Sequence, residues 1–247
     1  MDVSLYQAAA AMNATARWQD LIAENLSAAS VPGARKQEMS FSDVQAGMAP
    51  GTSGTGYYLP SASVVTNTQP GELRSTSNPL DFALEGPGFF TVQMGTDQNV
   101  YTRDGEFKLN AQGELVTKGG YPVMGQAGPL HFNPNSSATI TMSATGEVSQ
   151  GDQPIGKLNS VEFQNPGQLT MRGSGFFSAD DPANPPTPAT VTKVRQGFVE
   201  AGNTSPTTEM ASLITAMRMF EANQKVLQMQ GDRMSRVITD LGGSAQG

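Results

Sequence analysis

The sequence predicts an α+β protein in which N- and C-terminal helices form a coiled-coil-like helical domain and a central all-β domain is inserted between them. Apolar residues recur at heptad spacing near both termini, and short strand-like runs separated by tight turns fill the middle of the chain. An extended connector rich in Gly and Pro precedes the strands. We expect an N-terminal helix within 1–33, the connector at 34–79, the β domain at 80–200 and the C-terminal helix within 201–247.

The first predicted element is a helix from about residue 4 to about residue 29. Ser4 and Gln7 fit a capping box, the following run is rich in Ala, and Val31-Pro32-Gly33 should end the helix. Its heptad positions hold Leu5, Ala9, Met12, Ala16, Gln19, Ala23 and Leu26, and Trp18, the sole tryptophan, lies beside this row. A single helix lying on a globular core explains the pattern equally well.

The β region begins after the connector. Residues 89–93 and 100–103 are strand-like, and Asp104-Gly105 before Glu106 predicts a two-residue hairpin turn. Further turn pairs follow at short intervals, as in a compact domain of short strands. The Pro-rich stretch 180–188 predicts an exposed loop.

The last predicted element is a helix of about 35 residues, roughly 52 Å long, which should project from a domain of this size. Ser205 is its N-cap, Pro206 its first residue, and Gly242-Gly243 ends it. Its heptad row reads Met210, Leu213, Met217, Phe220, Gln224, Leu227, Gly231, Met234, Ile238 and Leu241.

Composition excludes several functional classes. A net charge of −7 and a pI near 4.7 argue against nucleic acid or anionic lipid as a partner. The longest apolar run near the N-terminus, 8–12, is too short for a membrane span or a signal-peptide core, so we expect neither membrane embedding nor a cleaved signal peptide. There is no cysteine, and His131 is the only histidine. We therefore expect no catalytic residues, no metal site, no cofactor and no small-molecule substrate.

Several segments resemble the bacterial flagellar rod and hook family. Residues 23–33 resemble the signature ANNLANxxTxGYK; Glu24, Ser27 and Pro32 depart from it, as does Ala34, the next residue. The closer matches are to the central β domain and to the segments around the start of the last helix, namely 78–90, 101–107, 120–123, 196–203 and 214–221.

This resemblance implies a structural subunit and not an enzyme. Family members leave the cell through the flagellar type III export apparatus without a cleaved signal and assemble helically in the rod, which crosses the periplasmic space, encloses the export channel and transmits motor torque. The implied partners are copies of the chain, other proximal and distal rod subunits and the export apparatus. The partner-binding row would contain Leu5, Met12, Trp18, Leu26, Met210, Leu213, Met217, Phe220, Leu227, Met234 and Ile238.

Chain length and the lack of a recognisable insertion between Met39 and Leu80 favour a proximal-rod subunit over a distal-rod one. Two other classes remain open at this point. One is an enzyme that acts on peptidoglycan, and the other is a surface adhesin with helical anchors.

Overall fold

The computed structural model describes residues 3–46, 57–95, 98–134, 136–173 and 175–243. The chain divides into two compact units. Unit 1 contains residues 1–26, 37–65 and 206–247, and unit 2 contains residues 27–36 and 66–205. Each unit is therefore assembled from segments that are far apart in the sequence.

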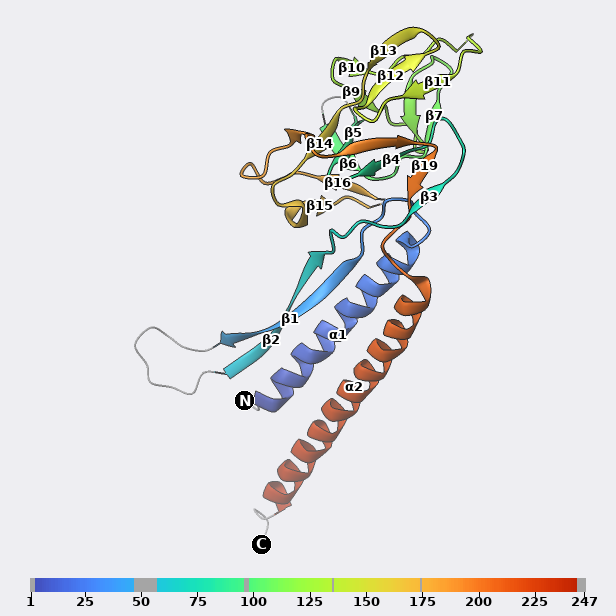
Figure 1. Cartoon of the computed structure of the whole chain (residues 1–247). Coiled ribbons are helices and arrows are strands. Elements are labelled where there is room, and N and C mark those ends of the chain that lie inside the picture. The colour runs from blue at the N-terminus through green and yellow to red at the C-terminus, as the bar shows by residue number, and fades with distance from the viewer. Residues whose placement is uncertain (1–2, 47–56, 96–97, 135, 174, 244–247) are drawn as a thin grey trace. The chain divides into compact units, whose positions relative to one another are not determined.

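Unit 1 consists of two long helices and one hairpin (Figure 1). Helix α1 spans Val3–Ala28 and helix α2 spans Pro206–Gly243, which confirms the two predicted helices and Pro206 as the first residue of the second. Between them, β1 (Gln37–Ala46) and β2 (Tyr57–Thr66) form a two-stranded sheet within the predicted connector. Residues 47–56 of that connector lie outside the described residues.

The predicted coiled-coil-like domain is wrong. The chain has a helix at each end and a largely β middle, as expected for α+β, but the heptad rows coincide only in part with the rows that the helices bury. On α1 the buried side chains are Ala14, Thr15, Leu21, Ile22 and Asn25, while Ala9 and Ala23 of the predicted row are exposed. Heptad spacing found the apolar residues but not the face that packs, because Ala is common on every side of this helix.

The Asn25 side chain shows what α1 packs against within unit 1. Its amide donates to the carbonyl of Gln37 at 2.8 Å and accepts from the Gln37 N–H at 2.9 Å. Asn25 thus satisfies both backbone groups at the first residue of β1, and it is itself 4% exposed. The helix is joined to the hairpin by this polar contact.

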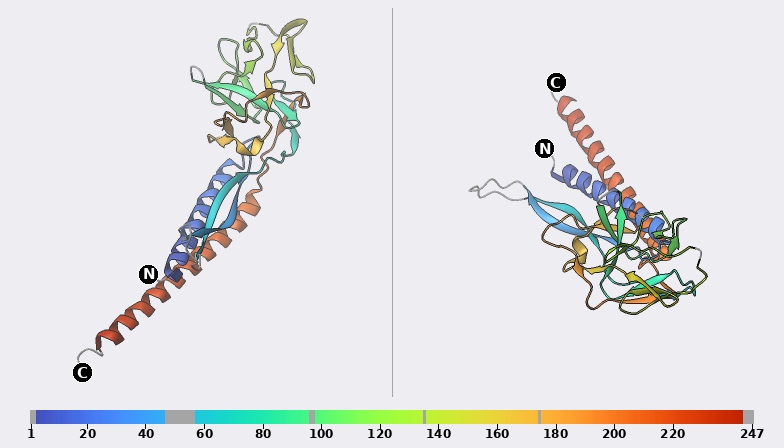
Figure 2. Two further views of the ribbon diagram at one scale, coloured as in Figure 1. Left: turned by 90° about the vertical axis from the view of Figure 1, so that its left-hand side faces the viewer. Right: turned by 90° about the horizontal axis from the view of Figure 1, so that it is seen from above.

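Unit 2 is built around a six-stranded antiparallel sheet with strand order β15-β16-β6-β5-β14-β17. Its strands are β5 (Phe89–Met94), β6 (Gln98–Thr102), β14 (Ser160–Glu162), β15 (Thr170–Met171), β16 (Phe176–Ser178) and β17 (Thr187–Pro188). The other strands pair in small sheets around it (Figures 1 and 2): β3 (Leu73–Ser75) with β19 (Phe198–Glu200), β4 (Phe82–Glu85) with β18 (Lys193–Gln196), β7 (Phe107–Leu109) with β8 (Leu115–Thr117), β9 (Met124–Gly125) with β10 (Gly128–Pro129), and β11 (Ile140–Met142) with β12 (Glu147–Gln150) and β13 (Gln153–Lys157).

Strand β5 is buried on both faces because its side chains alternate between two apolar clusters. Phe90 and Val92 belong to the larger cluster, where Phe90 meets Phe107 edge-on at 5.2 Å between ring centroids. Phe89 points to the other cluster, where it lies edge-on to Phe163 at 5.7 Å. The run Phe89-Phe90 is therefore part of a central strand whose two faces pack against different apolar clusters.

The predicted hairpin at Asp104-Gly105 is also wrong. Strand β6, before these residues, pairs with β5 and β16, whereas β7, after them, pairs with β8. The Gly105 carbonyl instead accepts the N–H of Phe82 at 3.0 Å, and a Cβ on Gly105 would lie 1.6 Å from the Phe82 carbonyl oxygen. Gly is required at position 105 because another backbone segment approaches closely there. A tight turn also favours Gly, so the dipeptide Asp-Gly does not distinguish the two situations.

Candidate functional site

Large apolar side chains exposed to solvent are concentrated on α2. Among the described side chains, ten large hydrophobic residues are between 38% and 69% exposed, and seven of them belong to this helix. They are Met210, Ile214, Met217, Met219, Val226, Met229 and Met234. An apolar surface of this extent is typical of a face that another polypeptide covers.

The side chains of α2 fall into rows along the helix that differ in how far they are buried. One row is buried or half-buried within the chain and follows alternating steps of four and three: Glu209, Leu213, Ala216, Phe220, Asn223 and Leu227. Met210, Ile214 and Met217 form an exposed row beside it, and Met219, Val226 and Met229 lie on a further side. A helix that is apolar on several sides is stable only when it is surrounded, so α2 has more apolar surface than this chain alone covers.

The predicted partner-binding residues of α2 come from both kinds of row. Leu213, Phe220 and Leu227 are half-buried within the chain, whereas Met210, Met217 and Met234 are 53%, 53% and 46% exposed. The side chain of Ile238 lies outside the described residues. The heptad missed the exposed residues Ile214, Met219, Val226 and Met229, which a separate count of apolar side chains on the outer faces would have found.

On α1, Met12, Trp18 and Leu26 are half-buried, and the side chain of Leu5 lies outside the described residues. These three predicted residues therefore offer less free apolar surface than α2 does.

Over the described residues, no helix is both long and apolar enough to cross a membrane.

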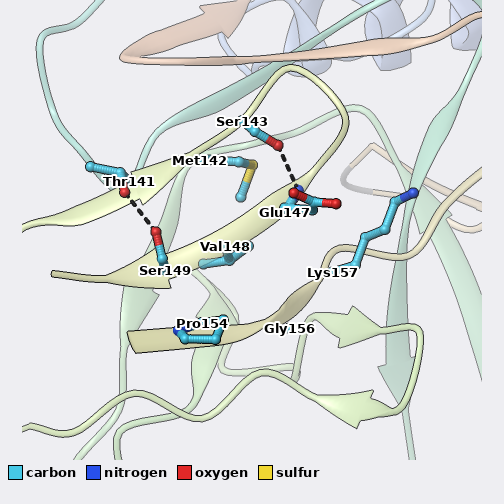
Figure 3. A pocket seen from close by; sticks show the side chains of 9 residues that line it. All are labelled: Thr141, Met142, Ser143, Glu147, Val148, Ser149, Pro154, Gly156 and Lys157. Atoms are coloured by element: carbon cyan, nitrogen blue, oxygen red, sulfur yellow. Dashed lines mark hydrogen bonds between the residues drawn. The ribbon is translucent and has the colours of Figure 1, made fainter. Parts of the chain in front are cut away.

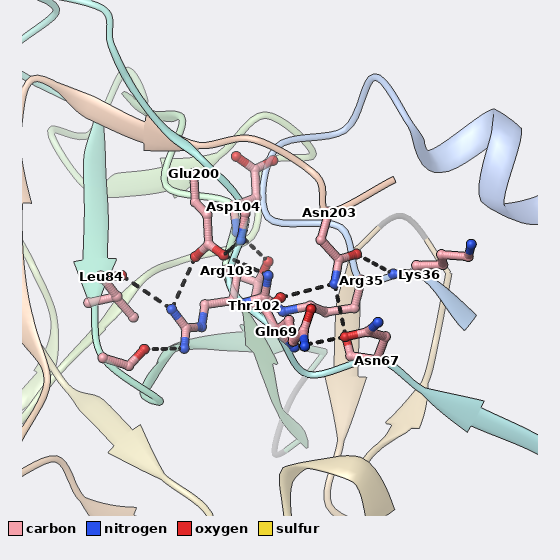
Figure 4. A network of polar contacts seen from close by, with 12 residues as sticks. Arg35, Lys36, Asn67, Gln69, Leu84, Thr102, Arg103, Asp104, Glu200 and Asn203 are labelled. Atoms are coloured by element: carbon pink, nitrogen blue, oxygen red, sulfur yellow. Dashed lines mark hydrogen bonds and ion pairs between the residues drawn. The ribbon is translucent and has the colours of Figure 1, made fainter. Parts of the chain in front are cut away.

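Within unit 2, Asn203 joins the three segments that lead to the elements of unit 1 (Figure 4). Its carbonyl oxygen accepts the N–H of Lys36 at 2.6 Å, and its amide donates to the carbonyls of Asn67 and Gln69 at 3.1 and 2.9 Å. The Asn67 N–H also donates to the Lys36 carbonyl at 2.8 Å. One side chain therefore fixes the segments that precede β1, follow β2 and precede α2.

Beside Asn203 lies a buried cluster of three charges. Glu200 is 0% exposed and faces two arginines that are each 3% exposed. Arg35 Nη1 lies 2.6 Å from Glu200 Oε1, and Arg103 Nη1 lies 3.0 Å from Glu200 Oε2. Burial lowers the pKa of Arg103 to about 10, with the charge of Arg35 acting in the same direction and Glu200 opposing both. The only sequence signal for this cluster was a Glu inside the apolar run Phe198-Val199-Glu200.

A shallow pocket of about 620 Å³ lies on the sheet formed by β11, β12 and β13 (Figure 3). Its polar groups include a hydroxyl pair, Thr141 and Ser149, with oxygens 2.8 Å apart, and the charged residues Glu147 and Lys157. Among the residues that line the pocket, no general base lies against a nucleophile, so this pocket does not have the arrangement of a catalytic site. Among the described residues, no three His, Cys, Asp or Glu residues lie together as metal ligands would.

Comparisons with known proteins show which family the chain resembles. The D1 domain of flagellar hook proteins FlgE/F/G matches residues 83–150, and the C-terminal domain of flagellar basal-body rod proteins FlgEFG matches residues 195–241. The chain is 32% identical to the flagellar basal-body rod protein FlgF of Mesorhizobium japonicum over 249 residues, covering 98% of this chain and 99% of the relative.

It is also 33% identical to the rod protein FlgG of Borreliella burgdorferi over 264 residues, covering 96% of this chain and 98% of the relative. The FlgF protein of Caulobacter vibrioides is 28% identical over 244 residues, covering 98% of this chain and 99% of the relative.

The chain belongs to the flagellar basal-body rod protein family. Its role is that of a structural subunit of the rod, of the FlgF or FlgG kind, and its place is the flagellar basal body. Family membership covers both termini and the centre of the chain, because the alignments span nearly the whole sequence. All seven exposed large apolar residues of α2 lie within the matched C-terminal rod domain.

Proposed function

We propose that this chain is a proximal-rod subunit whose α1 and α2 pack against copies of the chain and against other rod subunits. The observation that carries the proposal is the set of seven exposed large apolar side chains on α2. Burying one such side chain stabilises a contact by about 1.5–3 kcal/mol before the entropy of association is subtracted. Burial of several such side chains together is sufficient for a stable contact between subunits.

The arrangement of the rows suits a helical assembly. A head-to-tail contact that does not close on itself generates a filament, and it requires two different faces on each subunit. α2 has apolar rows on different sides, Met210-Ile214-Met217 on one and Met219-Val226-Met229 on another. Five of the seven exposed large apolar side chains on α2 are Met, which repacks easily against neighbours that are not identical. A core of such helices would enclose the export channel and transmit torque.

The length of the alignments supports a proximal over a distal position. The FlgG alignment spans 264 positions, more than the 247 residues of this chain, although it covers only 96% of the chain. FlgG therefore has residues for which this chain has no counterpart. The Mesorhizobium FlgF alignment needs only 249 positions while it covers 98% of the chain.

Export in an unfolded state through the flagellar type III apparatus, without a cleaved signal, fits the energetics of the helices. An isolated helix gains most of its stability from packing, and α2 leaves much of its apolar surface without a partner. We infer that the ends of the chain fold fully only in the rod, in the periplasmic space. Catalysis forms no part of this proposal.

The proposal is tested by removing apolar surface from α2 without changing charge or helix propensity. In the double variant Ile214→Gln with Met217→Gln, we expect soft-agar motility to be lost and the chain to be missing from purified hook-basal bodies. The control places two uncharged substitutions on neighbouring exposed positions of the same helix, Ala211→Gln with Thr215→Gln. Motility equal to that of the wild type in the first variant would overturn the assembly surface.

A copy count tests the proximal position separately. Quantitative mass spectrometry of hook-basal bodies should find a handful of copies of this chain, about one helical turn, relative to the hook subunit. Several-fold more copies would place the chain in the distal rod, and its absence from the particle would reject a rod position altogether.

A further inference from the structure

A small cavity in unit 2 lies against the buried charge cluster. It has a volume of about 100 Å³ and is lined by Arg35, Thr66, Thr68, Pro87, Phe89, Arg103, Pro166 and Phe177. A water molecule's share of the liquid is about 30 Å³, so the cavity has room for a group of a few heavy atoms and not for a nucleotide or a sugar.

The charges around this cavity do not balance. Arg35 and Arg103 carry two positive charges, and Glu200 is the only carboxylate paired with either of them in the described part of the chain. All three side chains are at least 97% buried, so one excess positive charge is held away from water. An uncompensated buried charge is costly, and an anion next to the arginines removes that cost.

Hydrogen-bond donors are also left over. Arg103 Nη1 and Nη2 donate to the carbonyls of Leu84 and Gly86, but the buried Nε has no hydrogen-bond partner among the described residues. Arg35 Nη1 is also buried, and although it is close to Glu200, it forms no aligned hydrogen bond. The Thr66 and Thr68 side chains line the same cavity. Guanidinium groups beside a cavity are the donors that proteins use for phosphate and carboxylate groups.

We propose that this cavity binds a small oxyanion, of the size of phosphate or sulfate, between Arg35 and Arg103. Its position is distinct from the assembly surface on α2, and the proposal does not depend on the function in the rod. A bound oxyanion would stabilise unit 2 at the point where the N-terminal segment and the segment before α2 meet. The cluster is drawn in Figure 4.

The test is thermal unfolding of the full chain with 0.1–10 mM phosphate or sulfate at constant ionic strength set by sodium chloride. Ligand at about 100 times Kd should raise the Tm of the wild type by roughly 5 °C or more. In Arg35→Gln the response to the oxyanion should disappear. These concentrations are too low for the general stabilising effect that such salts have on all proteins at high concentration.

Arg195→Gln is the matched control. Like Arg103, Arg195 lies 5.1 Å from the centroid of a Phe ring and is paired with a Glu, but its side chain is 49% exposed. Its replacement should leave the oxyanion response unchanged. Equal responses in wild type, Arg35→Gln and Arg195→Gln would overturn the proposal.

Two further measurements do not depend on the folding of Arg35→Gln. Thr68 is exposed at the cavity, so Thr68→Glu should supply a carboxylate from the chain itself, raise the Tm in chloride and remove the oxyanion response. In crystals of the wild type soaked in selenate, the anomalous signal should lie within hydrogen-bond distance of Arg35 and Arg103. A structure with no selenate in this cavity would reject the site.

Discussion

Neutralising Glu200 is the most informative test of how unit 2 is held together. The variant Glu200→Gln keeps the shape of the side chain and leaves an amide oxygen for the Gly71 N–H, which now donates to Oε1 at 2.8 Å. It removes the negative charge that faces Arg35 and Arg103 at 2.6 and 3.0 Å. Two guanidinium groups would then be buried without a counter-charge from the chain.

The expected cost follows from burial. Removing one partner of a buried ion pair destabilises a protein by about 3–5 kcal/mol, because the remaining charge is still desolvated. For a unit of 150 residues, each kcal/mol lowers Tm by about 2–4 °C. We therefore expect Glu200→Gln to lower the Tm of unit 2 by roughly 6–20 °C, measured by scanning calorimetry in chloride buffer.

The control is Glu85→Gln, which removes the same charge from a residue that pairs with Arg195 at 3.7 Å and is 59% exposed. An exposed pair contributes about 0–1 kcal/mol, so this variant should unfold close to the wild type. A second substitution, Arg35→Gln, in the Glu200→Gln background should restore part of the loss, because it removes one of the two uncompensated charges. If Glu200→Gln were as stable as Glu85→Gln, the cluster would not be the buried ion network described above.

Two more predictions concern unit 2. Burial raises the pKa of Asp104 from its ordinary 3.8 to about 6 in the folded state, so its contribution to stability is complete below about pH 4 and is lost as the pH rises through 6. In Asp104→Asn the amide oxygen can still accept the Glu106 N–H. The free energy of unfolding, measured by urea unfolding, should rise by about 1–2 kcal/mol at pH 8 and stay unchanged below pH 4. A gain of equal size at both pH values would contradict this prediction. Asn203→Ala removes three hydrogen bonds to Lys36, Asn67 and Gln69 and should cost about 2–3 kcal/mol by urea unfolding, whereas an unchanged midpoint would mean that water replaces the side chain without loss.

The sequence by itself determined the two helices and the β middle, because these depend on neighbouring residues. Pro206 starts α2 as its fixed backbone angle requires. The short motifs of the middle and of the last helix also indicated the family, since they depend on residue identity and not on spatial arrangement.

Only the tertiary structure decided which helix face packs and what Asp104-Gly105 does. A heptad row records that apolar residues are present, but the residues that become buried depend on what packs against the helix, here partly β1 through Asn25. In the same way, Gly105 serves close approach to Phe82, a residue 23 positions away. The charge cluster of Arg35, Arg103 and Glu200 joins three distant segments, and no local pattern encodes such a meeting.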